Sequence, residues 1–461
     1  MLDERIKIMK EYSISKAIIK MAIPSITGLV IMGLYNMVDT MFVSWIGKEA
    51  TSAAQVVYPI TMVLSSIGLA LGIGGGSFIS RLLGQNNMDK ANQICTTNIL
   101  LSLTMGILAT LLSIIFLKPL LVMFGAKESF MAYAEGYGFY IMLGGFATIM
   151  NMTLNNLLRA EGSARHSMIA MIIGAVLNII LDPLFIFTFD MGVEGAAIAT
   201  TISQIVTLIL LVAYYIRKKS LLELSMKNIK VEMNILLAIV KIGSPTFARQ
   251  ILVSIALALL NHSAFSYGGE VALASVGIVL KMIMIIMYFI FGLSQGFQPV
   301  AGFNYGARRY DRVLEAIYVT IKIGLAFSII TTALSFVFSK QILGLFRPEP
   351  AVMDIAQVYL KYALGSLVMM SCSNVISVFY QAIGKAKAAL ILSVSRQGIF
   401  FIPAVLILPR ILGLEGVLMA QFVADIGTLV FSIIIMVPSI KRIKRFVNKT
   451  ERKYIQNGED C

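Results

Sequence analysis

The chain has 461 residues, of which 58% are hydrophobic and 13% charged, and its mean hydropathy is +0.85. This composition excludes an ordinary soluble domain and is typical of a protein that lies almost entirely within a membrane. The formal net charge of +14 lies in the segments between apolar runs, so positive cytoplasmic loops are favoured over a nucleic-acid-binding surface. Three scattered cysteines and two histidines predict neither a disulfide framework nor a zinc or haem site.

Apolar segments long enough to cross a bilayer follow one another along nearly the whole chain. We predict an all-α integral membrane protein with twelve transmembrane helices, near 16–40, 51–78, 92–117, 131–157, 168–189, 193–216, 236–262, 271–299, 313–338, 353–380, 387–409 and 414–438. Lys and Arg are concentrated in the tails and in the loops of one side, so we expect both termini to be cytoplasmic. The N-terminus has no cleavable signal pattern. We therefore expect a multi-pass protein of the inner (cytoplasmic) membrane.

The two halves of the chain repeat each other at a nearly constant offset. Residues 20–24 (KMAIP) and 159–165 (RAEGSAR) resemble residues 241–245 (KIGSP) and 381–387 (QAIGKAK), at offsets of 221 and 222. Residues 84–90 and 192–195 have similar partners at 306–312 and 413–416. The repeat predicts two pseudo-symmetric six-helix lobes with one orientation in the membrane. We expect an N-lobe at 1–216, a cytoplasmic connection at 217–232, and a C-lobe at 233–461 that ends in a basic tail.

The most informative stretch is 174–187 (GAVLNIILDPLFIF), where Asn178 and Asp182 are one helical turn apart. Pro183 has no amide hydrogen, so it loosens the helix and frees carbonyl oxygens. A charged carboxylate within the membrane costs at least a few kcal/mol. We therefore expect Asp182 to bind a proton, a metal cation or a cationic solute in a cavity. Asp39, late in the first span, is a second such acid, and its repeat partner is the apolar Leu260.

Oxygen-bearing residues accompany these acids in the N-lobe, namely Tyr35, Asn155, Asn156, Asn178 and Thr200. Two carboxylates with amide and hydroxyl oxygens can hold a hard monovalent cation such as Na⁺. Two acids in one small site can also take up and release a proton near the working pH. Both coupling ions stay open, and so does a structural role for Asp39 as a cap or pairing partner at the end of its span.

Ionisable residues also occur in the predicted C-lobe spans, where each needs a partner or a water-filled cavity. An ion pair that involves Asp425 is one interpretation. For each charge, snorkelling or structural pairing is one reading and a role in transport is the other; the cations are Arg249, Lys281, Lys361 and Arg396. Glycines 68, 72 and 76 recur every four residues in the second span and predict close helix packing. No phosphate-binding loop of the Walker type occurs, so we expect an ion gradient as the energy source and no cofactor.

Together these segments resemble the multidrug and toxin extrusion (MATE) family of transporters, in its bacterial drug-exporter branch. The resemblance rests on Pro24 and on 35–40 (YNMVDT), 75–84 (GGSFISRLLG), 159–162 (RAEG), 178–183 (NIILDP) and 192–200 (GVEGAAIAT). It implies an antiporter that exports cationic or amphipathic compounds against Na⁺ or H⁺ by alternating access. It also implies a cation or proton site at Asp39, Asn178, Asp182 and Thr200, a substrate cavity lined by Tyr35, Tyr137, Asn155 and Met171, and a bend at Pro24.

Two alternatives remain open. A lipid-linked oligosaccharide flippase of the same broad superfamily would line its cavity with basic residues, and Arg249, Lys281 and Arg396 are candidates. Another part of the family uses a glutamate in span seven, which is absent from 244–250 (SPTFARQ). A membrane enzyme would need clustered acids or a catalytic histidine, so we expect no enzymatic activity. The expected partners are the lipid bilayer and small cationic or amphipathic molecules, without nucleic acid, and the expected functional form is a monomer.

Overall fold

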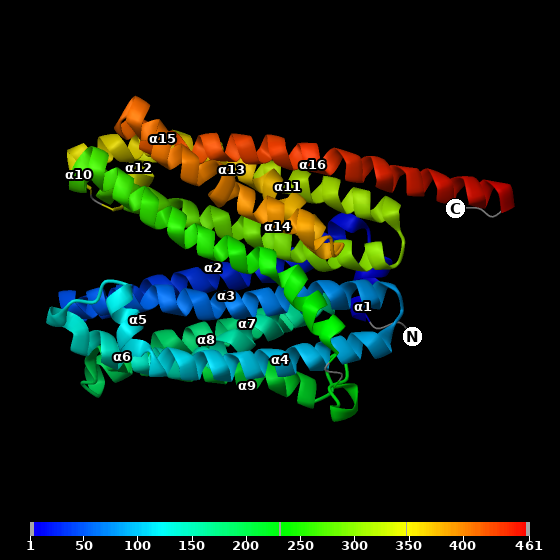
Figure 1. The fold of residues 1–461 in the computed structure, drawn as a ribbon, viewed down its shortest axis with the longest axis horizontal. Helices are drawn as coiled ribbons and strands as arrows, with labels where there is room; N and C mark the ends of the chain where they lie inside the picture. The colour runs from blue at the N-terminus through cyan, green and yellow to red at the C-terminus, as the bar shows by residue number, and fades with distance from the viewer. Residues whose placement is uncertain (1–3, 230–231, 347, 458–461) are drawn as a thin grey trace. The chain divides into compact units, whose positions relative to one another are not determined.

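The computed structural model describes residues 4–229, 232–346 and 348–457, and these residues form helices without a strand (Figure 1). Ten of their helices are long and apolar enough to cross a membrane, and a bent pair of helices can supply one more. The prediction of an all-α, multi-pass membrane protein is confirmed. The number of crossings and the cytoplasmic location of both termini stay predictions.

The first half of the chain contains the helices that form the candidate site. Its elements are α1 (Glu4–Lys10), α2 (Ile14–Ile46), α3 (Lys48–Gly84), α4 (Met88–Ile115), α5 (Leu117–Met123), η1 (Glu128–Phe130), α6 (Met131–Leu143), α7 (Gly145–Ala160), α8 (Ala164–Pro183), η2 (Leu184–Thr188) and α9 (Gly192–Ile216). The predicted span at 131–157 is the pair α6 and α7, which bend by 44°. The bend lies at Gly144, where Thr201 of α9 comes close and donates to the Tyr140 carbonyl (2.7 Å).

The second half begins with η3 (Met226–Asn228) and continues through α10 (Met233–Gly306), α11 (Tyr310–Val337), α12 (Ser339–Gly344), α13 (Pro350–Ala382), α14 (Ala386–Val394), η4 (Ser395–Phe401), α15 (Ile402–Leu412) and α16 (Leu414–Asn457). Gly269 interrupts α10 with a positive φ of 64°. The 74 residues of α10, at about 1.5 Å per residue, exceed the roughly 30 Å bilayer core several-fold. This length and the break at Gly269 are consistent with the two spans predicted at 236–262 and 271–299, which stay a prediction.

The chain packs as two compact units, Met1–Ile6 with Ile23–Gln250 and Lys7–Ala22 with Ile251–Cys461. The three passages from one unit to the other fall inside helices, in α1 after Ile6, in α2 beside Pro24 and in α10 after Pro245. Because these units differ from the lobes expected from chain order at residues 7–22 and 233–250, the lobe boundaries at 216 and 233 stay a prediction.

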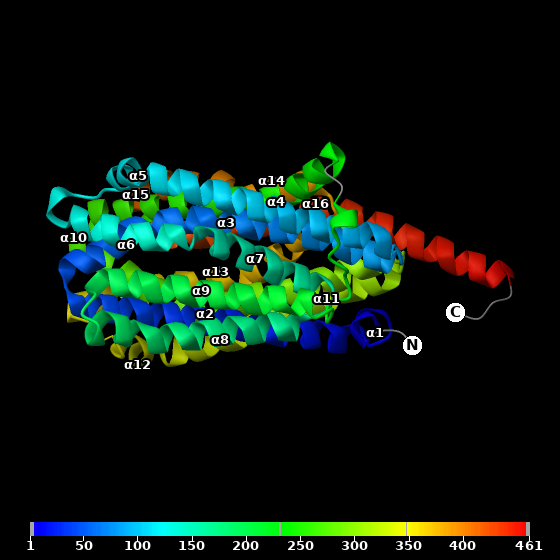
Figure 2. The same ribbon diagram turned by 90° about the horizontal axis from the view of Figure 1, so that it is seen from below.

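Close helix packing in the first unit positions the site. Gly68, Gly72 and Gly76 of α3 face α7, and a Cβ on Gly68 would lie 2.4 Å from the Ile149 carbonyl oxygen. A Cβ on Gly72 would lie 2.8 Å from Asn156 Cβ. The small-residue pattern therefore brings the backbones of α3 and α7 together, as predicted. On its other side α7 packs against α8 and α9, which also pack against each other (Figure 2).

Candidate functional site

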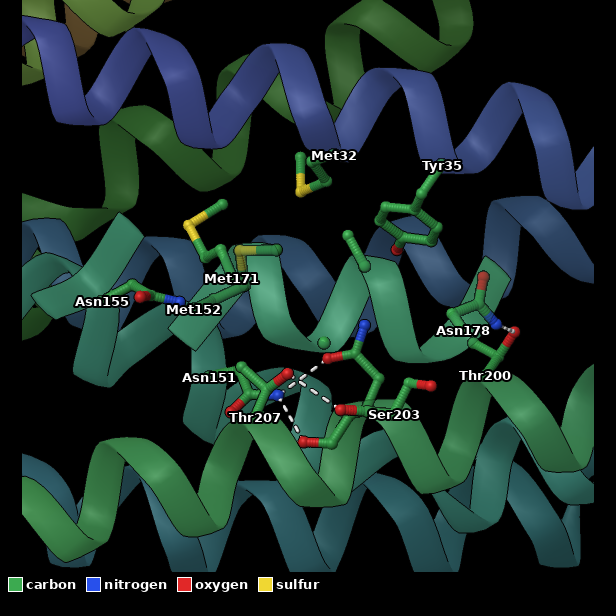
Figure 3. Close-up of a pocket in the computed structure, with 13 residues that line it drawn as sticks. Met32, Tyr35, Asn151, Met152, Asn155, Met171, Asn178, Thr200, Ser203 and Thr207 are labelled. Carbon is green, nitrogen blue, oxygen red and sulfur yellow. Dashed lines mark hydrogen bonds between the residues drawn. The ribbon is translucent and has the colours of Figure 1, made fainter. Parts of the chain in front are cut away.

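Helices α2, α7, α8 and α9 of the first unit enclose a pocket of about 490 Å³, which includes the solvent space at its mouth. Figure 3 shows Met32 and Tyr35 of α2 on one side and Thr200, Ser203 and Thr207 of α9 on the other. The pocket is lined by Met32, Tyr35, Asn151, Met152, Asn155, Met171, Gly174, Ala175, Asn178, Thr200, Ser203, Gln204 and Thr207. Its lining offers amide and hydroxyl groups, one aromatic ring and three thioethers, and no charged side chain.

Five of the residues predicted from the sequence meet in this pocket, namely Tyr35, Asn155, Met171, Asn178 and Thr200. Gly28 of α2 allows Met171 to approach, because a Cβ at position 28 would lie 3.2 Å from the methionine sulfur. Asn155 is fixed by Ser167 of α8, whose hydroxyl donates to its Oδ1 (2.6 Å). Arg159 in turn donates to the Ser167 hydroxyl (3.4 Å), so this motif residue supports the pocket wall from behind.

Asn178 connects the pocket to Asp182. Its amide Nδ2 donates to Asp182 Oδ1 (3.0 Å) and to Thr200 Oγ1 (3.3 Å). The side chains of Asn178 and Asp182 are buried, with 1% and 0% of their surface exposed. The two residues lie on one face of α8, one turn apart as their spacing indicates, and α8 ends at Pro183, where η2 begins.

Asp39 of α2 completes the carboxyl pair. Its side chain lies within hydrogen-bonding reach of the Asp182 side chain. The Tyr137 hydroxyl of α6 lies close enough to interact electrostatically with both carboxyl groups. Two carboxyl groups this near each other disfavour double ionisation, so a shared proton or a bound cation is favoured. Three buried oxygens here have no hydrogen-bond partner, namely Asp39 Oδ1, Asn178 Oδ1 and Asp182 Oδ2. Unpaired buried oxygens are unusual, and this set suits a proton or a hard monovalent cation such as Na⁺.

Five predicted residues do not line the pocket, namely the two acids Asp39 and Asp182 described above, Asn156, Tyr137 and Pro24. Tyr137 is buried and lies within electrostatic range of the carboxyl pair, and Pro24 lies about four helical turns before Asp39 in α2. Helix α2 is continuous through Pro24. Since proline has no amide hydrogen, the Lys20 carbonyl receives no backbone hydrogen bond from position 24. The bend expected at Pro24 stays a prediction.

One polar pair of the pocket lining, Asn151 and Gln204, was not predicted from the sequence. Asn151 Nδ2 donates to the Gln204 carbonyl oxygen (2.8 Å) and to Gln204 Oε1 (2.7 Å). The sequence contained a pattern that indicates both residues, because Asn151 lies one helical turn before Asn155 and Gln204 lies one turn after Thr200. The i, i+4 rule applied to these two helices would have identified both residues.

The ionisable residues predicted in the C-lobe spans do not line the pocket, and they differ from one another in pairing and exposure. Arg396 forms an ion pair with Asp425, whose side chain is fully buried. The predicted ion pair at Asp425 is therefore confirmed. Lys281 and Lys361 are exposed on the described surface, whereas Arg249 is half-buried.

Comparison with known proteins agrees with the motifs and the repeat. A family model described as MatE matches residues 24–184 and again residues 245–406, more than half of the chain. The curated multidrug export protein MepA of Staphylococcus saprophyticus is 28% identical over 428 residues, which are 92% of this chain and 94% of that protein.

Solved structures of the same kind superpose over most of the chain. An outward-facing structure of a multidrug resistance MATE family transporter of the MOP superfamily has a TM-score of 0.92 at 27% identity, with 96% of this chain and 100% of that chain covered. A MOP superfamily transporter from Pyrococcus furiosus, described as having a binding pocket of reverse polarity that suggests a different function, has a TM-score of 0.91 at 27% identity over 96% and 99%. With the repeated match of the family model, these similarities show that the chain belongs to the MatE family of membrane transporters.

Proposed function

We propose that this protein is an ion-coupled antiporter that exports cationic or amphipathic compounds across the cytoplasmic membrane. Family membership supports transport, and the relatives named as multidrug export proteins support the class of substrate. The single observation that supports coupling is the pair of the half-buried Asp39 and the buried Asp182 beside the pocket, with unpaired oxygens around it.

The pocket suits an organic cation. The Tyr35 ring offers a π face to a cation, and the thioethers of Met32, Met152 and Met171 adapt to apolar groups of varied shape. The carboxyl pair behind Asn178 supplies the negative charge. Because the pocket lining has no positive side chain, a cation that enters it meets attraction and no repulsion.

Coupling follows from competition for one negative charge. When a proton or Na⁺ occupies the carboxyl pair, a cation in the pocket loses its counter-charge and its affinity falls. When the organic cation binds first, the carboxyl pair favours release of the driving ion. The two ligands therefore exclude each other, and an ion gradient can drive export through alternating access. Either H⁺ or Na⁺ fits this scheme, and we propose that α2 bends at Pro24 when the occupancy of the pair changes.

A lipid-linked oligosaccharide flippase is the second candidate. One structural relative is described as having a pocket of reverse polarity that suggests a different function, so a transporter of this fold with another substrate has to be considered. Such a pocket would need basic residues for pyrophosphate. The lining of the N-terminal pocket contains none, and Arg396 is neutralised by Asp425. These observations favour the exporter of cations.

The test is efflux of a fluorescent organic cation from proteoliposomes, with Na⁺ and pH gradients imposed separately. Wild type is compared with Asp39→Asn, Asp182→Asn and the control Asp354→Asn, which changes an exposed acid of α13. We expect one gradient to drive efflux in wild type and the control, and neither to drive it in the two site variants. Dye movement that is equally fast in all four proteins would refute the coupling site, and no movement in wild type would favour the flippase.

A further inference from the structure

A second buried polar cluster lies in the C-terminal unit and has no role in the function proposed above. Arg396 donates from Nε to Asp425 Oδ1 (2.6 Å) and from Nη2 to Asp425 Oδ2 (3.0 Å). Gln421 Nε2 also donates to Asp425 Oδ2 (3.2 Å), and the Ser366 hydroxyl contacts the same oxygen. The exposed fractions of the Arg396 and Asp425 side chains are 19% and 0%. The carboxylate is thus fully satisfied by a bidentate guanidinium and two neutral donors.

The internal repeat relates this cluster to the pocket of the N-terminal unit. At the offset of 221 that links the glycines at 192 and 413, Asp425 corresponds to Gln204 and Gln421 to Thr200. Arg396 corresponds to Gly174 or Ala175, at offsets of 222 or 221. The two segments matched by the family model, 24–184 and 245–406, begin 221 residues apart and end 222 residues apart, which are the same two offsets. Every N-terminal counterpart in this set lines the pocket.

The two units therefore have side chains of different size and charge at positions that the repeat makes equivalent. In the N-terminal unit, small residues at 174 and 175 leave the pocket open, and its polar partners are neutral. In the C-terminal unit, the same position holds a long cationic side chain, and the partner is a carboxylate. The backbone differs as well, because Arg396 lies in the π-helical segment η4 whereas Gly174 and Ala175 lie in the α-helix α8. π-Helical insertions of this kind are frequently found at functional sites.

We propose that the C-terminal unit contains a latent cation site, related by the repeat to the N-terminal pocket, and that the guanidinium group of Arg396 occupies it as a tethered cation. Asp425 is its counter-ion, and Gln421 and Ser366 complete the polar wall. Tyr359, the repeat partner of Tyr137, is buried and is an electrostatic neighbour of Arg396. The ligand that this site would take without Arg396 is a small planar cation of the guanidinium class.

The Arg396 guanidinium determines where in the protein an exported cation can bind. A side chain attached to the same helix bundle competes with free solutes at an effective concentration in the millimolar range or above, and its bidentate geometry matches the carboxylate. An exported cation therefore does not displace it, and binding of such cations is confined to the N-terminal pocket. Binding of a guanidinium group within the C-terminal unit does not depend on which ion drives transport.

The experiment empties the site and supplies the missing cation from solution. Purified full-length Arg396→Ala is unfolded thermally in detergent at increasing concentrations of methylguanidinium, kept in the millimolar range and far below denaturing concentrations. Urea, which is planar and neutral, is the matched control ligand. Wild type and Arg410→Ala, which removes an exposed arginine of α15, are the control proteins. The double variant Arg396→Ala/Asp425→Asn removes the counter-charge.

We expect the melting temperature of Arg396→Ala to lie below that of wild type and to rise saturably with methylguanidinium but not with urea. Wild type, Arg410→Ala and the double variant should show no such rise. The absence of a saturable rise in Arg396→Ala overturns the proposal, and so does an equal rise in the double variant, because the ligand would then bind elsewhere. If Arg396→Ala is not recovered as folded protein, its yield from cells grown with methylguanidinium becomes the readout. An increased yield that the double variant does not share supports the site, and an unchanged yield overturns it.

Discussion

Replacement of Asp182 by asparagine isolates the charge of the candidate coupling site. The amide has nearly the same shape as the carboxyl group, and its oxygen can still accept the hydrogen bond that Asn178 Nδ2 donates at 3.0 Å. Burial and packing at this position are therefore preserved, and the variant should fold. What changes is the ability of the pair with Asp39 to carry a negative charge or to hold a proton or Na⁺.

The size of the effect follows from the position of Asn178, which lines the pocket and bonds the carboxylate. A cation in the pocket is then separated from the Asp182 carboxylate by a distance on the order of 7 Å. At that separation and an effective dielectric constant of about 20, one unit charge contributes roughly 2 kcal/mol, or about 30-fold in affinity. The assay is equilibrium binding of a fluorescent organic cation to purified wild type, Asp182→Asn and Asp354→Asn, over a range of pH and Na⁺ concentration.

Wild type and Asp354→Asn should bind the cation with an affinity that falls as the driving ion increases. Asp182→Asn should bind it roughly 30-fold more weakly, with little dependence on that ion. Unchanged affinity in Asp182→Asn, with the ion dependence intact, would refute the electrostatic reasoning and separate the pocket from the carboxyl pair.

The remaining predictions concern the supports of the site. Gly72→Ala places a Cβ 2.8 Å from Asn156 Cβ and 2.9 Å from the Met152 carbonyl oxygen, so α3 and α7 must separate; we expect a loss of about 1–3 kcal/mol in thermal stability. Gly277→Ala, which meets nothing within 4 Å, is the control, and an equal loss in both variants would contradict the packing argument. Asn151→Leu leaves Gln204 unpaired and should weaken binding of the organic cation by about 1–2 kcal/mol, roughly 5- to 30-fold, as measured by the same binding assay; unchanged affinity would show that the pair does not shape the pocket. At the turn between α7 and α8, burial raises the pKa of Glu161 above its ordinary value of 4.5. A raised pKa in the folded state stabilises the protein below pH 4.5 and withdraws that contribution as the pH rises through the folded-state pKa. The melting temperature of wild type minus that of Glu161→Gln should therefore decrease from pH 4.5 upward, and an increase would contradict the sign.

The apolar spans and the neighbouring polar residues Asn178 and Asp182 were accessible from the sequence because they depend on local patterns. Mean hydropathy over about 20 residues identifies helices that cross a membrane, and the four-residue spacing places Asn178 and Asp182 on one face. The bend at Gly144 was not accessible, since it depends on Thr201 of another helix reaching the Tyr140 carbonyl.

The rest of the site depends on how helices face one another. Asn151 and Gln204 lie 53 positions apart in the chain, and their contact arises when α7 packs against α9. The ion pair of Arg396 with Asp425 was one of several interpretations, because four cations in those spans could have paired with that acid. Only the packing of η4 against α16 selects Arg396. Periodicity gives the face of each helix, and tertiary packing decides which faces meet.

The proposed coupling is a competition between the organic cation and the driving ion for the carboxyl pair of Asp39 and Asp182. Its most direct test is calorimetric titration of the purified protein with an organic cation, in two buffers of different ionisation enthalpy and with and without Na⁺. We predict that binding to wild type releases protons, or becomes weaker as Na⁺ increases, and that Asp39→Asn/Asp182→Asn shows neither effect. Binding that releases no proton and ignores Na⁺ in wild type would contradict the claim, and so would the same ion dependence in the double variant.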